Sequence, residues 1–390
     1  MRDAKALHEI ERNSRSSIGQ SRRPRRYLSY MAASLLAGLP IFAYAQASDP
    51  ASEAAAAIAR DQARRAAEDQ AADRVARETT PQASLAAGKA VALGPFPVEH
   101  PCFPIRSIEF DTHLPHKLRW VRGHLDRYVG RCAGHEGLNY ILKSLEAAFL
   151  DRGLVTTRAG LPPQDLSSGI LHVAVVPGVS AGVRGGTPKD RRAWAVASPL
   201  HKGDLINIRA IEQGLDQMRR VPGRQVAVDL APGATPGESL LNLQAKPSKL
   251  LSGSISVNNL AGSTVGRWQG TGQATLSNLV GLNEILNGYV NSRVNSPAVP
   301  ADSKGSGGSL SIPYGWWTFG VAGSANRYSQ HVIGQVQAFD TSGTVTSVSA
   351  YVERVLHRDR ISKTSLQVQL QVGGVAASST ISRSVSSIRI

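Results

Sequence analysis

The chain has 390 residues, of which 42% are hydrophobic and 19% charged, and its formal net charge is +15. This composition excludes an intrinsically disordered chain, and the length allows two to four domains. The charge alone would suggest a nucleic-acid partner, but residues 1–45 hold eight Lys and Arg against three acids, so we expect no nucleic acid.

Residues 1–45 have the layout of a secretory signal peptide. A basic cluster precedes an apolar run from Leu28 to Phe42, and the small-residue tripeptide Ala43–Ala45 predicts cleavage before Gln46. The run is short for a transmembrane helix and contains both Gly and Pro, although a single N-terminal anchor helix is the alternative. We therefore expect an exported protein.

Two cysteines, Cys102 and Cys132, follow this segment. In an oxidising compartment they can pair and close a loop of about 30 residues, and their spacing does not match a redox or metal motif. We interpret them as a structural disulfide, with free thiols as the alternative.

Residues 46–80 are rich in alanine and predict a helix without an apolar stripe, because Ile58 and Val75 are its only large aliphatic residues. Such a helix is either a solvated spacer or an element of a wet, polar cavity. Residues 81–98 contain Pro and Gly and predict a flexible linker.

Short α and β segments follow and predict two small α+β domains, residues 99–178 and 179–248. In the first, the pattern predicts strands at 104–111, 154–161 and 170–178 and helices at 116–130 and 135–153. In the second, it predicts a helix at 206–220 and strands at 224–233 and 240–247.

No helix is predicted after Lys249, and residues 249–390 predict about eight strands, most of them about ten residues long. The segments are 250–261, 268–280, 282–294, 307–315, 317–329, 334–341, 345–357 and 364–374.

These strands alternate aliphatic or small residues with Ser, Thr, Asn and Gln, as in Thr364–Val372, "TSLQVQLQV". The pattern suits a sheet over a soluble core or a barrel in lipid, and the export signal, the strand length and the uncharged polar face favour the barrel. Five aromatic residues near strand ends are predicted to form an interfacial girdle, with core packing as the alternative: Trp268, Tyr289, Tyr314, Trp316 and Trp317.

Several long motifs carry a family resemblance. They are "CFPIRSIEF" at 102–110, residues 130–178 with their "GLVTTR" and "PPQDLSSG" segments, residues 207–239, "GTGQATLSNLVGLNEIL" at 270–286 and "GSLSIPYG" at 308–315. The chain resembles the outer-membrane transporters of two-partner secretion, the haemolysin activation and secretion proteins, over about residues 99–375.

The resemblance implies two POTRA domains, an α+β fold, in the periplasm, followed by a transmembrane antiparallel β-barrel in the bacterial outer membrane. It implies a pore that recognises an unfolded adhesin-like or haemolysin-like exoprotein, through that partner's N-terminal secretion domain, and secretes it to the cell surface. The helix at 46–80 would plug the lumen, and outer-membrane lipid would surround the barrel.

A POTRA domain can accept an extended client on its sheet edge. We expect the receiving face to include Leu145, Phe149, Leu154, Val155, Thr156 and Thr157, with Leu145 and Phe149 as plain core positions in the alternative interpretation. The turn at Gln164 and Asp165 sets the geometry of the module or contacts the barrel.

One departure from the family pattern concerns the barrel, which is expected to have sixteen strands and a Val-Arg-Gly-aromatic lumen loop. About eight strands give an incomplete barrel without that loop, and they predict a chain truncated within the barrel. The alternatives are an outer-membrane protein assembly factor, a soluble β-sandwich adhesin and a non-functional remnant. The sequence contains no catalytic or nucleotide-binding motif, so neither an enzyme, a cofactor nor a metal is expected.

Overall fold

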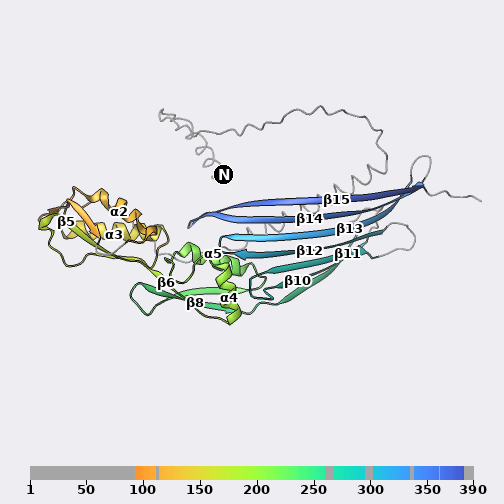
Figure 1. Ribbon diagram of the computed structural model, residues 1–390, viewed down its shortest axis with the longest axis horizontal. Helices are drawn as coiled ribbons and strands as arrows, with labels where there is room; N and C mark the ends of the chain where they lie inside the picture. Colours follow the sequence, from red (N-terminus) through yellow and green to blue (C-terminus); the bar gives the residue numbers. More distant parts are fainter. Residues whose placement is uncertain are drawn as a thin grey trace, which may run out of the picture. The chain divides into compact units, whose positions relative to one another are not determined.

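The computed structural model describes residues 93–110, 114–259, 268–294, 302–333, 338–359 and 361–381. All of them belong to one compact unit of the chain. They form two small α+β domains and a seven-stranded antiparallel sheet (Figure 1). The predicted signal peptide, the helix at 46–80 and the first part of the linker lie outside the described residues.

The first domain contains a three-stranded sheet in the order β2-β5-β4, with β5 in the centre, parallel to β2 and antiparallel to β4. Its elements are β1 (Phe103–Pro104), β2 (Ser107–Phe110), η1 (His116–Leu118), α2 (Trp120–Leu125), η2 (Asp126–Tyr128), β3 (Cys132–Ala133), α3 (His135–Asp151), β4 (Arg158–Gly160), η3 (Leu166–Ser168) and β5 (Ile170–Val176). The single helix predicted at 116–130 is therefore wrong, since it divides into α2 and two short 3-10 turns.

Helix α3 follows the predicted 3.6-residue spacing, so that Ile141, Leu145 and Phe149 are fully buried in one stripe. They pack with Leu118 of η1, with Val121 and Leu125 of α2 and with Leu171 and Val173 of β5. Phe96, inside the predicted linker, also packs against this core. The linker is thus anchored at its C-terminal end.

The second domain has a sheet in the order β6-β8-β7, with β6 parallel and β7 antiparallel to β8. Its elements are β6 (Val179–Gly185), α4 (Pro188–Ala197), α5 (Ile208–Arg219), β7 (Gln225–Pro232) and β8 (Glu238–Lys246). Neither β6 nor α4 was predicted from the sequence. Helix α4 nevertheless has clear start signals, because Thr187 and Asp190 form a capping box and Pro188 occupies the first turn.

The large sheet runs in chain order from β9 to β15, and each pair is antiparallel. The strands are β9 (Leu251–Asn258), β10 (Gln269–Ser277), β11 (Ile285–Arg293), β12 (Asp302–Tyr314), β13 (Trp317–Ile333), β14 (Ala338–Arg358) and β15 (Lys363–Ile381). The expected eight strands are seven in the described residues, since 338–341, the described part of the strand predicted at 334–341, belongs to β14.

Strand length also differs from the prediction, because β13, β14 and β15 have 17, 21 and 19 residues. The described sheet does not close, and β9 and β15 are its two edges.

The register places most aliphatic residues of the seven strands on one face, although Ile285, Val345 and Val375 lie on the other. Along one row, Leu310 pairs with Val321, Val321 with Ala350 and Ala350 with Leu370. Many aliphatic side chains of this face are exposed, among them Ile255, Val290, Val348, Val368, Leu370 and Val372. The opposite face carries mainly Ser, Thr, Asn and Gln, with Glu353 and Arg293 as charged exceptions, so the predicted alternation is confirmed.

Three of the five predicted girdle residues lie on or beside the apolar face near strand ends: Trp268, Tyr314 and Trp317. Two predictions are wrong. Tyr289 lies in the middle of β11 on the polar face, where its ring covers Gly307. Trp316 lies in the turn between β12 and β13 and packs against the core of the second domain.

Candidate functional site

Helix α5 of the second domain is buried on nearly all sides. Its apolar side chains Ile211, Leu215 and Met218 fill the core of the second domain. Its polar side chains Glu212 and Gln213 are also buried, each with 1% of the residue exposed. A helix with a buried polar side requires hydrogen-bonding partners there, and the turns of the large sheet supply them.

Arg358, the last residue of β14, is the centre of this polar contact. Its guanidinium donates to the carboxylates of Asp216 at 2.6 Å and Glu212 at 3.3 Å, and it reaches Gln213 Oε1 at 3.4 Å. Arg209 also donates to Glu212, at 2.9 Å. The Arg358 and Glu212 side chains are only 3% and 2% exposed, so these charges are removed from water and depend on each other.

The turn between β12 and β13 makes a second contact with the second domain. Gly315 adopts a φ of 55° and donates its N–H to the carbonyl of Val196 in α4 at 2.9 Å. The amide of Gln217 in α5 donates to Thr318 Oγ1 at 3.2 Å. Together with the partly buried Trp316 ring, these bonds fix this turn between α4 and α5.

Arg224 makes a third contact, to the turn between β10 and β11. Its guanidinium donates to Asp190 Oδ1 at 2.6 Å and to Asn283 Oδ1 at 2.5 Å, and its side chain is 2% exposed. Asn283, which is fully buried, donates in turn to the carbonyl of Ala193 in α4 at 2.7 Å. Three successive turns at one end of the sheet are thus bonded to the second domain, and we call this contact surface the junction.

The pKa of Asp190 lies below its ordinary value of 3.8. Burial raises it, but hydrogen bonds from the Thr187 N–H and hydroxyl and the charge of Arg224 lower it by more. A depressed pKa means that the ionised carboxylate stabilises the folded state above pH 3.8 and that this stabilisation is lost as the pH falls further.

We therefore expect the Asp190→Asn variant to lose less stability than the unsubstituted chain when the pH is lowered from about 5 to below the depressed pKa of Asp190. Urea unfolding across this range checks the prediction. Parallel losses in both proteins would contradict it.

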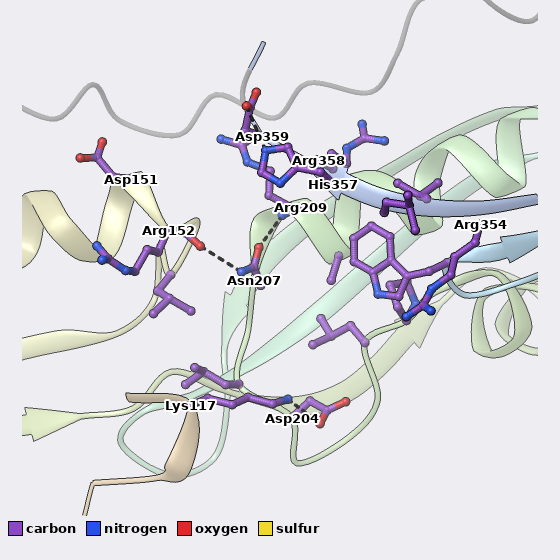
Figure 2. A pocket seen from close by; sticks show the side chains of 18 of the residues that line it. Lys117, Asp151, Arg152, Asp204, Asn207, Arg209, Arg354, His357, Arg358 and Asp359 are labelled. Atoms are coloured by element: carbon purple, nitrogen blue, oxygen red, sulfur yellow. Dashed lines mark hydrogen bonds and ion pairs between the residues drawn. The ribbon is translucent and has the colours of Figure 1, made fainter. Parts of the chain in front are cut away.

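A cleft of about 790 Å³ adjoins the junction (Figure 2). It is lined from the first domain by Lys117, Trp120 and Arg152, from the second by Asp204 and Asn207, and from the sheet by Trp316 and the stretch 354–359. Asn207 donates to the carbonyl of Arg152 at 2.9 Å, which joins the two small domains at its wall. Its lining mixes cations, carboxylates and aromatic rings, which suits contacts with a polypeptide better than with a small apolar ligand.

The residues predicted to receive a client lie differently from the expectation. The strand predicted at Leu154–Thr157 is wrong, because these residues form a turn after α3 and β4 starts at Arg158. Leu145, Phe149 and Leu154 are buried in the core, and the Thr157 hydroxyl accepts from the Gly178 N–H at 3.2 Å. Val155 and Thr156 lie in the turn. Their role toward a client remains a prediction.

Gln164 and Asp165 set the local geometry of the first domain. The Gln164 side chain bonds to both the N–H and the carbonyl of His172 in β5, at 2.7 and 2.9 Å. Asp165 caps η3 by accepting from Ser167 N–H at 2.9 Å.

Cys102 and Cys132 form a disulfide with a sequence separation of 30, beside the paired strands β1 and β3. In the chain-entropy model, a closed loop of this length stabilises the fold by about 3 to 4 kcal/mol. We expect the Cys102→Ser, Cys132→Ser double variant to lose about that much in urea unfolding of the first domain. A change below about 1 kcal/mol would show that the bridge does not act through loop closure.

Sequence reasoning missed Arg358, Arg224 and the polar side of α5. The only signal for them is the charge pattern of α5, which also fits a solvated helix face. Within the described residues, no three His, Cys, Asp or Glu side chains gather as a metal site. No described helix is both long and apolar enough to span a membrane.

Three family models match the chain. The haemolysin secretion/activation protein ShlB/FhaC/HecB model matches residues 237–374, the ShlB-type POTRA domain 103–178 and a second POTRA model 181–232. The small domains are thus POTRA domains, as the resemblance implied.

Curated relatives and solved structures agree with these matches. The chain is 35% identical to the outer membrane transporter CdiB-2 of Burkholderia pseudomallei, over 70% of this chain and 50% of that protein. It is 26% identical to the hemolysin transporter protein HpmB of Proteus mirabilis, over 72% of this chain and 50% of that protein.

The structure of CdiB from Escherichia coli aligns with a TM-score of 0.69 and 25% identity, over 84% of this chain and 60% of that one. The chain spans about half the length of the curated relatives that it matches.

Proposed function

Since the chain belongs to the haemolysin secretion/activation protein family, with POTRA domains ahead of its sheet, we propose that the complete protein is an outer-membrane translocation pore for an unfolded exoprotein. The observation that carries the proposal is the seven-stranded sheet with one largely apolar face and one face of mostly uncharged polar residues, joined directly to a POTRA domain. The partner is a secreted haemolysin-like or adhesin-like protein with an N-terminal secretion domain.

The two faces of the sheet support this role. Exposed aliphatic side chains on one face match acyl chains, whereas the Ser, Thr, Asn and Gln side chains of the other match a wet lumen. Neutral hydrogen-bonding groups would let an extended chain pass without binding it tightly by charge. Such a pore requires no enzyme activity, cofactor or nucleotide, and client folding outside the cell would drive transport.

The first POTRA domain is the proposed receiving module, facing the periplasm. Its sheet has β4 as one edge, so a client strand would add along Arg158–Gly160 and continue past the turn at Val155 and Thr156. Leu145, Phe149 and Leu154 would then support this edge from the core. The signal peptide at 1–45 and a plug helix at 46–80 complete the proposed organisation.

The test is secretion of an exoprotein encoded beside this chain. With the remaining barrel strands supplied, we expect the exoprotein on the cell surface, and we expect it to accumulate in the periplasm when residues 103–178 are deleted. A photo-crosslinking residue at Ala159 should capture the arrested client, whereas the same residue at the exposed Arg184 of the second domain should not. Undiminished secretion by the deletion variant would contradict the proposed role of the first domain.

A further inference from the structure

One row of side chains borders the apolar face at the end of the sheet that carries the junction. Directly paired positions place Tyr314 beside Trp317, Trp317 beside Arg354, and Arg354 beside Leu366. We call these four residues the rim row. The next row inward is wholly apolar and consists of Ile312, Phe319, Val352 and Val368. A cation therefore lies directly beside an exposed apolar surface.

Arg354 is oriented by an aromatic ring rather than by a carboxylate. Its guanidinium carbon lies 4.7 Å from the centre of the Trp317 ring, and Trp317 stacks on Phe319 with centroids 6.3 Å apart. Arg354 is exposed, and no described carboxylate forms an ion pair with it. Stacking on an aromatic ring holds a guanidinium in place while its N–H groups remain free to donate hydrogen bonds. Arginine commonly binds phosphate groups in this arrangement.

The charged side chains of the cleft beside the rim row differ in whether a carboxylate pairs with them. Arg354 lines the cleft together with Arg152 and Lys117, and Lys117 is paired with Asp204 at 3.7 Å (Figure 2). Arg152 stacks on Trp120 at 3.8 Å and has no described carboxylate partner. By contrast, Arg358 in the same cleft is already bonded to Glu212 and Asp216. An anionic group at the rim row would thus meet Arg354, a cation without a described acidic partner.

We propose that the rim row binds the headgroup of an anionic phospholipid of the periplasmic leaflet, with the phosphodiester on Arg354. The acyl chains lie along the apolar rows, which join the rim row without a polar break, and Tyr314 and Trp317 lie at headgroup depth. Phosphatidylglycerol is favoured over phosphatidylethanolamine, since the latter carries an ammonium that the nearby cations repel. The proposal rests on the lipid-facing side given to the sheet under the proposed function.

Native mass spectrometry of the full chain in detergent micelles, titrated with phosphatidylglycerol or phosphatidylethanolamine, tests this site. For Arg354→Ala we expect phosphatidylglycerol binding to weaken about tenfold, the effect of losing one charge-assisted pair. Arg354→Lys keeps the positive charge but loses the planar guanidinium that can donate two parallel hydrogen bonds. Its affinity for phosphatidylglycerol is expected to lie between those of the unsubstituted chain and the Arg354→Ala variant. Arg184→Ala is the matched control, because it removes an equal and exposed charge from the second domain.

Equal binding by the Arg354→Ala and Arg184→Ala variants would overturn the proposal, as would full displacement of the lipid by inorganic phosphate. Flotation with vesicles of phosphatidylethanolamine alone distinguishes a failure of the headgroup site from a failure of the proposed function. A chain that inserts into those vesicles but gives no Arg354 effect refutes only the headgroup site. A chain that inserts into no vesicle refutes the lipid-facing side and the headgroup site together.

Discussion

Replacing Arg358 with alanine is expected to lower the free energy of unfolding by about 3 kcal/mol, because the change removes a cation that lies 3.3 Å from the buried carboxylate of Glu212. Asp216 also loses its partner at 2.6 Å, whereas its ion pair with Lys363 is longer, at 3.7 Å. Among the charged contacts of the described residues, this one joins the second POTRA domain to the sheet through the least exposed side chains. Urea unfolding in detergent micelles, followed by tryptophan fluorescence, measures the loss.

Two controls make the Arg358 result specific to the junction. Arg184→Ala removes an exposed charge and is expected to change stability by less than about 0.5 kcal/mol. Cysteines placed at Gln217 and Thr318, whose side chains bond at 3.2 Å, should cross-link less efficiently once Arg358 is lost. A loss in the Arg358→Ala variant no larger than that of the control would show that the junction does not depend on this residue.

Replacing Arg224 with alanine is expected to cost a similar amount, about 3 kcal/mol, at neutral pH. The substitution leaves the Asp190 carboxylate, whose side chain is 16% exposed, without its cation, and removes the donor to Asn283. A double-mutant cycle with Asp190→Ala isolates the pair, and we expect a coupling energy above about 1 kcal/mol. Additive losses in the cycle would contradict a direct interaction between Arg224 and Asp190.

The architecture follows from the sequence wherever one periodicity dominates. The stripe of α3 and the alternation of β15 each predict an element and its buried or apolar side, and both elements form. The position of Tyr289 can also be predicted from the sequence. Leu286, Gly288 and Val290 alternate along the strand on the apolar face, so Tyr289 between them belongs to the opposite face.

Other features depend on tertiary contacts that no local pattern encodes. The β-branched residues of Leu154–Thr157 favour a strand by propensity, yet Gly153 turns the chain at a φ of 78° and Thr157 bonds to Gly178 instead. Likewise, the polar side of α5 fits solvent equally well until the turns at Gly315 and Arg358 cover it.

Spin labels on neighbouring positions of β14 test most directly whether the sheet faces lipid. The native cysteines are paired with each other, so single cysteines introduced at Ser347, Val348, Ser349 and Ala350 can be labelled selectively. In lipid vesicles, labels at positions 348 and 350 should collide mainly with oxygen, and labels at 347 and 349 mainly with a water-soluble nickel complex. Nickel accessibility that is equal at all four positions, in a chain that stays soluble without detergent, would contradict the account.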